Sequence, residues 1–308
     1  MMTLYFKSRK FEPRFREIRF TIRRLRSSPL STAGLVIITM FALIALIAPI
    51  LAPPVDPSRP YNMPRDGFAS EPRPPSPEHI FGTTEGQYDI YYGIIWGTRT
   101  AFVIGIVVVG ASLLLGILAG SISGYYGGKI DNIIMRITDV VFAFPGLILA
   151  VAFSVALGRS MESVMLAITL VSWPTYARIL RGDILQVKQE TYVEASEALG
   201  GSDYWIITRH ILPNAIYPLF IVATLDIGSI VLLAAALSFL GIGVPLGHAD
   251  WGQLISLARN WIVGPPHDPL RYWYTWTIPG LFILFFVLGW NLLGDAFRDI
   301  LDPKIRRR

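Results

Sequence analysis

The chain has 308 residues, of which 53% are hydrophobic and 16% are charged, with a formal net charge of +5 and no cysteine. A soluble domain carries about 25% charged residues, so this composition favours an integral membrane protein. The lack of cysteine excludes disulfides, thiolate metal sites and cysteine nucleophiles.

Six apolar runs are long enough to cross a bilayer, which takes about 20 helical residues. They lie at 31–52, 100–122, 134–157, 161–181, 214–241 and 275–297. The sequence therefore predicts an all-α integral membrane protein with six transmembrane helices. The first run follows a long basic segment and is too long for a signal-peptide core, so we expect a retained span.

Lys and Arg are divided unevenly between the two sides of the predicted bundle. With six spans, the tails 1–30 and 298–308 lie on one side, and that side holds twenty of the 27 basic residues. Because basic loops stay inside the cell, we expect both termini to be cytoplasmic. The tail 1–30 directly precedes a span, so we interpret it as a segment that contacts lipid headgroups rather than nucleic acid.

The predicted outer segments differ from the inner ones. Residues 53–97 begin with a proline-rich stretch and are expected to form an extracytoplasmic loop, followed by a core domain at 98–297 with five spans. The loop 243–273 carries several aromatic residues where an interfacial belt would lie. We expect Trp251 and its neighbours to lie near a docking surface for an outer partner.

A polar segment, 190–213, interrupts the apolar runs. Tyr192, Ala195 and Leu199 fall on one face of a predicted short helix, and Gly200 with Gly201 supplies its end. Ser202 is then expected to cap a second helix. Periodicity alone leaves two interpretations open: the segment is a solvated amphipathic connector, or it is a surface to which a partner protein binds.

One acidic residue, Asp226, lies within the fifth predicted span. A carboxylate at membrane depth is costly and normally faces a cavity or a partner. Asp226 is therefore either a residue that lines a transport path or a packing residue hydrogen-bonded near Ser229. Glycines 116, 120 and 124 form a stripe that predicts close helix packing.

The sequence shows no pattern typical of a metal site, a nucleotide site or a catalytic site. The four histidines are scattered, so we expect no metal site. The segment "GYYGGKI" fails as a phosphate loop because Ile130 follows Lys129, where Ser or Thr should contact magnesium. Catalytic constellations at membrane depth are also lacking, so we expect no catalytic residue and no ATP binding by this chain.

The stretch "EASEALG…HILP" resembles the EAA loop of ABC-importer permeases. Five further segments resemble the same family in the same order: "FGTTEGQYD" (81–89), "GYYGGKIDNIIMRITDVVFAFP" (124–145), "SWPTYARILRG" (172–182), "LSFLGIG" (237–243) and "NLLGDAFRDILDPKIR" (291–306). The chain is thus similar to the second permease subunit of dipeptide/oligopeptide/nickel-type importers. The resemblance implies a type I ABC-importer permease bundle in a prokaryotic inner membrane.

The resemblance also implies a mechanism. The segment 190–213 would form two coupling helices that insert into an ATPase subunit, and the residues matching the motif are Glu194, Ala195, Ser196, Gly200, Leu212 and Pro213. The implied partners are a homologous second permease, two ABC ATPase subunits that bind ATP and Mg, and an extracytoplasmic binding protein.

Other functions stay open at this point. Permeases of this type also serve nickel and oligosaccharide importers, and we prefer peptides on family frequency. An ion-coupled secondary transporter would need no ATPase, but such proteins usually show inverted repeats and several buried ionisable residues. The sequence shows one buried acid, Asp226, and no such repeat.

Overall fold

The computed structural model describes residues 28–301, and the regular elements of that part are helices. The expectations for most of the basic tail 1–30 and for 302–308 lie outside the described residues. The helices are α3 (Pro29–Leu51), α4 (Ile90–Tyr126), α5 (Gly128–Phe142), α6 (Gly146–Leu157), α7 (Met161–Val187), α8 (Thr191–Ala198), α9 (Asp203–Ile206), a π-helix (Ile207–Ile211), α10 (Leu212–Ala215), α11 (Tyr217–Phe239), α12 (Trp251–Ala258), a 3₁₀ turn (Arg259–Trp261) and α13 (Trp273–Leu301).

Five helices in the described part are long and apolar enough to cross a membrane: α3, α4, α7, α11 and α13. The predicted span at 134–157 is not one straight helix. That stretch is divided between α5 and α6, which meet at an angle of 94°. Pro145 explains the break, because proline has no N–H to donate and disfavours helical geometry at the residue before it. Residues 28–301 therefore contain five candidate spans, or six if the bent pair is one span.

Helix α4 is longer than expected. It begins at Ile90, where the carboxylate of Asp89 accepts a hydrogen bond from the Tyr92 N–H at 2.7 Å. The expected loop 53–97 therefore ends at 89. At about 1.5 Å per residue, 37 residues span about 55 Å, well beyond the roughly 30 Å of a hydrocarbon core. The first turns pack against the preceding loop, where the Tyr92 hydroxyl donates to the Pro60 carbonyl at 2.6 Å and Gly93 lies against Met63.

The glycine stripe of α4 forms the predicted seam, and its partner is α7. A Cβ at Gly116 would clash with the side chain of Tyr176. A Cβ at Gly120 would lie 2.7 Å from the Ala177 carbonyl oxygen, and one at Gly124 would lie 2.9 Å from the Ile184 Cβ. The two helices are therefore packed backbone to backbone along this seam.

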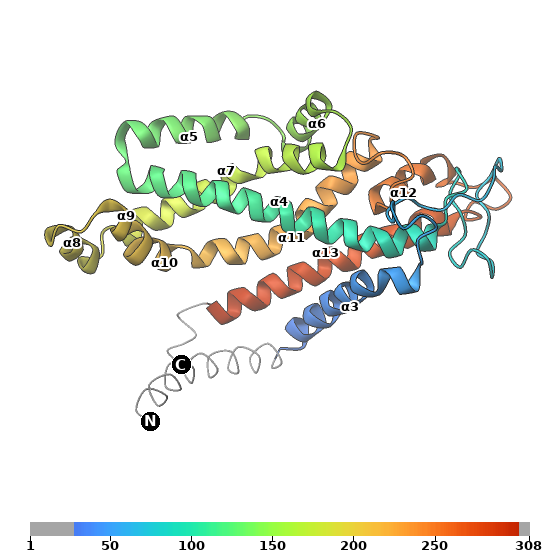
Figure 1. Cartoon of the computed structure of the whole chain (residues 1–308), viewed down its shortest axis with the longest axis horizontal. Helices are drawn as coiled ribbons and strands as arrows, with labels where there is room; N and C mark the ends of the chain where they lie inside the picture. Colours follow the sequence, from blue (N-terminus) through green and yellow to red (C-terminus); the bar gives the residue numbers. More distant parts are fainter. Residues whose placement is uncertain (1–27, 302–308) are drawn as a thin grey trace.

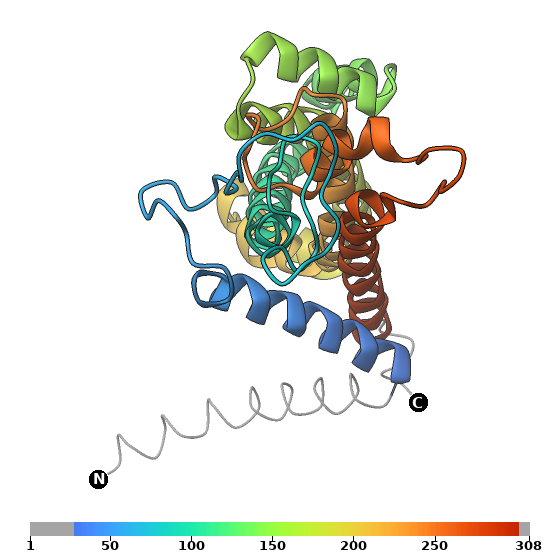
Figure 2. The same cartoon turned by 90° about the vertical axis from the view of Figure 1, so that its right-hand side faces the viewer.

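The bundle has two distinct ends (Figure 1). Helices α8, α9 and α10 project at one end, and the segment 52–89 lies with α12 at the opposite end. Figure 2 looks onto that opposite end and shows this segment folded over the helices. An antiparallel bridge joins Asn62 to His248 and thereby connects the loop before α4 to the loop before α12. Helix α3 packs against α13 at the side of the bundle.

Candidate functional site

The segment 190–213 folds as two helical arms around a glycine turn, as the sequence predicted. Gly200 adopts a φ of 79°, which favours glycine. Its N–H donates to the Glu197 carbonyl at 2.9 Å, and the Gly201 N–H donates to the Ser196 carbonyl at 3.1 Å. These two bonds form a Schellman motif, which ends α8 sharply and lets the chain reverse.

The second arm differs in detail from the expectation. Ser202 occupies the N-cap position but its side chain makes no capping hydrogen bond. The arm then passes from α9 through a π-helical turn into α10. Pro213 has no N–H to donate to a preceding carbonyl, and the Asn214 side chain donates to the His210 carbonyl at 2.6 Å. Sequence periodicity did not predict the π turn.

The face formed by Tyr192, Ala195 and Leu199 points to solvent. Leu199 is 88% exposed, whereas the buried residues of α8 are Val193 and Ser196. The second arm adds Tyr204, which is 79% exposed, and the half-exposed Trp205. Exposed apolar patches of this kind are typical of interaction sites. Sequence reasoning had not included Leu199, Tyr204 and Trp205 among the site residues, although their large apolar side chains in a polar segment were a usable signal.

The residues that match the EAA motif are spread over this segment. Glu194, Ala195 and Gly200 are exposed on the first arm and its turn, and Pro213 is exposed at the end of the second. Ser196 is buried, and Leu212 packs partly against the bundle core. The segment therefore has a solvent-facing side and a side that anchors it.

Asp226 has a specific hydrogen-bond partner on another helix. Its carboxylate accepts a hydrogen bond from the Tyr176 hydroxyl at 2.8 Å, which joins α11 to α7. Tyr176 is fully buried. A bonded partner lowers the cost of keeping a carboxylate at membrane depth, so the packing role that we weighed has a concrete basis.

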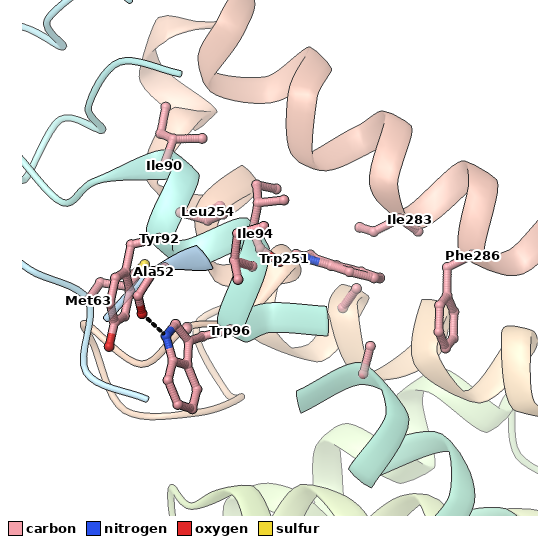
Figure 3. Close-up of a cluster of buried hydrophobic side chains, with 14 of the residues drawn as sticks. Ala52, Met63, Ile90, Tyr92, Ile94, Trp96, Trp251, Leu254, Ile283 and Phe286 are labelled. Atoms are coloured by element: carbon pink, nitrogen blue, oxygen red, sulfur yellow. Dashed lines mark hydrogen bonds between the residues drawn. The ribbon is translucent and has the colours of Figure 1, made fainter. Parts of the chain in front are cut away.

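The expectation that a docking surface lies near Trp251 stays a prediction, but the Trp251 side chain is only 2% exposed and offers little surface of its own. Figure 3 shows it inside a cluster of buried side chains. Its indole N–H donates to the Ile94 carbonyl at 3.1 Å, and its ring packs against those of Phe41 and Phe286. Hydropathy could not distinguish this buried aromatic residue from an interfacial one.

The fold is that of a protein with several apolar helices long enough to cross a membrane. Residues 112–307 match the family model of the binding-protein-dependent transport system inner membrane component, and residues 18–70 match the N-terminal TM domain of oligopeptide transport permease C. The chain belongs to this family of ABC-transporter permeases.

Curated relatives agree over nearly the whole chain. A probable D,D-dipeptide transport system permease protein of Escherichia coli is 39% identical over 280 residues, covering 91% of this chain and 89% of the relative. A dipeptide transport system permease protein of Alkalihalophilus pseudofirmus is 37% identical over 290 residues, covering 94% and 90%. An oligopeptide transport system permease protein of Bacillus subtilis is 36% identical over 286 residues, covering 92% and 88%.

The fold is also similar to a solved structure. A chain of the MetNI methionine ABC transporter, in an inward facing conformation, matches with a TM-score of 0.54 at 17% identity. The match covers 68% of this chain and 96% of that one. At this identity the likeness concerns the fold.

Proposed function

We propose that this chain forms half of the translocation path of an ATP-driven peptide importer and is driven through residues 190–213. The exposed apolar face around Leu199 carries the proposal, because a solvated connector has no reason to expose this many large apolar side chains. Glu194, exposed on the same arm, supplies a charged contact, and Gly200 sets the angle between the arms.

The proposed assembly contains two related permease bundles around one path, two ATPase subunits against the 190–213 segments, and a binding protein at the opposite end. ATP and Mg are bound by the ATPase subunits. The excess of Lys and Arg on one side supports a prokaryotic inner membrane location with both termini in the cytoplasm. Peptides are the proposed cargo because the relatives named above are dipeptide and oligopeptide permeases.

Co-purification tests the docking surface. The tagged chain is isolated from its native membrane in mild detergent, and the proteins that accompany it are identified by mass spectrometry. Leu199→Arg should remove the ATPase subunits, because a charge would be buried without a partner in the contact. Val55→Arg, at an 81% exposed position in the opposite-end loop, is the matched control and should retain them.

Uptake in whole cells completes the test. Glu194→Ala and Gly200→Val should abolish uptake while the subunit remains inserted in the membrane. If Leu199→Arg retains the ATPase and both other variants transport normally, the coupling function of 190–213 is refuted.

A further inference from the structure

The end of α4 is tied to the second arm of the 190–213 segment by a buried tyrosine. Tyr125 is 6% exposed, and its hydroxyl donates to the Asp203 carboxylate at 3.0 Å. The ammonium group of Lys188 donates to the Tyr125 carbonyl at 2.8 Å and lies 4.9 Å from the centre of the tyrosine ring. One residue of α4 thus contacts the chain on both sides of the first arm.

The Tyr125–Asp203 contact joins two segments that do not follow one another in the chain. The first arm follows α7 directly, and the second arm leads into α11, but α4 has no covalent link to either. Any displacement of the arms therefore reaches α4 through non-covalent contacts. The Tyr125–Asp203 hydrogen bond is such a contact, and it joins the start of the second arm to the end of the longest helix.

Side-chain hydrogen bonds stabilise the junction between α4 and α5, next to Tyr125. Asp131, in the first turn of α5, accepts hydrogen bonds from the Ser123 hydroxyl at 2.5 Å and from two guanidinium nitrogens of Arg181 at 2.5 and 2.6 Å. A bidentate pair between an arginine and a carboxylate fixes the relative orientation of the two side chains as well as their distance. Together with the Gly124 contact on α7, it makes the end of α4 a firm anchor for Tyr125.

The two arms pack against each other beside the glycine turn. The ring centres of Tyr192 and His210 lie 6.3 Å apart, and a Cβ at Gly201 would lie 3.3 Å from Cγ1 of Ile206. A displacement of the first arm at the exposed face around Leu199 therefore moves the second arm as well. An attachment at Asp203 passes the displacement on to α4.

We propose that Tyr125 is a positioning residue that transmits movement of the second arm to α4 through Asp203. This inference rests on the proposed coupling function of residues 190–213. Tyr125 acts through Asp203, and its role is to make α4 move together with the arm. Lys188 supports it by holding the Tyr125 carbonyl and ring.

The test follows α4 directly and does not depend on the cargo. The chain contains no cysteine, so nitroxide labels can be attached through Ile106→Cys on α4 and Leu284→Cys on α13, both more than half exposed. The distance between the labels is measured in the reconstituted full transporter, with and without ATP and vanadate. ATP hydrolysis is measured on the same samples.

Tyr125→Phe keeps the ring and removes the hydroxyl. We expect ATPase association and basal hydrolysis to persist, while the population that shows the ATP-dependent distance change falls about tenfold, the factor for one charge-assisted hydrogen bond. Asp203→Ala should behave alike, and Asp203→Asn should recover part of the change because its amide oxygen can still accept the bond. Tyr92→Phe is the control, since it removes a hydroxyl bonded to Pro60 at the far end of α4.

Any of three results from the distance measurement would overturn the proposal: an unaltered distance change in Tyr125→Phe, an equal loss in Tyr92→Phe, or no ATP-dependent movement of α4 in the unmutated chain. Loss of the ATPase from Tyr125→Phe would also overturn it, because the residue would then serve assembly. Failure of the coupling function itself would appear differently, as absence of ATPase subunits from the unmutated transporter.

Discussion

The hydroxyl of Tyr176 donates a hydrogen bond to the carboxylate of Asp226 at 2.8 Å, across the contact between α7 and α11. The same tyrosine also fills the space beside Gly116 on α4. One side chain therefore links three helices of the bundle, through a polar contact on one side and close packing on the other. This arrangement makes Asp226 part of the architecture of the bundle.

Removing the Tyr176 hydroxyl should destabilise the permease. We expect Tyr176→Phe to lower the free energy of unfolding by about 1 kcal/mol, because the Asp226 carboxylate loses its partner in an apolar surrounding. Thermal unfolding of the detergent-purified protein measures the effect. The double variant with Asp226→Leu should regain stability. If the stability lost in the double variant instead equals the sum of the losses in the two single variants, the carboxylate has a further partner.

The α4–α7 seam should reject even a methyl group. Gly116→Ala places a Cβ against Tyr176, and overpacking of this kind costs about 1–3 kcal/mol. Gly110→Ala on the same helix meets nothing within 4 Å and should be neutral or stabilising by up to about 1 kcal/mol. The yield and thermal midpoint of the two purified variants make the comparison, and equal behaviour would argue against a tight seam.

The turn between the arms should depend on a glycine at position 200. Gly200→Ala places a side chain at a φ of 79°, a conformation that costs an ordinary residue about 1 kcal/mol. Hydrogen exchange across 191–206 should therefore accelerate. Gly182→Ala, in the interior of α7 with open space around it, is the control and should slow local exchange. Unchanged exchange in Gly200→Ala would mean that the turn relaxes without strain.

The loop before α4 should be held more tightly at low pH. The His79 imidazole lies 2.7 Å from the Asp89 carboxylate and 3.5 Å from that of Asp66, which also pairs with Arg73. The hydrogen bond to Asp89, first among several causes, raises the pKa of His79 above its usual 6.5. Its contribution to stability is thus fully present below pH 6.5 and is lost as the pH rises through the folded-state pKa.

Thermal midpoints of the unmutated protein and of His79→Asn, measured between about pH 5.5 and 8.5, check this expectation. The difference between them should shrink as the pH rises. A difference that grows with pH would show that the neutral imidazole is the stabilising form.

Much of the architecture could be predicted from local composition. A run such as 31–52 must avoid water whatever surrounds it, so its length and lack of charge suffice to predict a helix that can span the membrane. The turn at Gly200 is similarly local, because the left-handed backbone there depends on the residue itself. The stripe at 116, 120 and 124 predicted close packing because small residues have that effect beside any helix.

Other features depend on which distant segments meet, and local composition carries no record of that. An apolar stretch has the same composition whether lipid or protein covers it. The sequence therefore did not predict the early start of α4 at Ile90 or the burial of Trp251. The partner of Asp226 lies 50 residues away in the chain, and the Tyr125–Asp203 bond joins residues 78 apart. The residue types made such contacts possible, but the packing of α4, α7 and α11 against one another selected the partners.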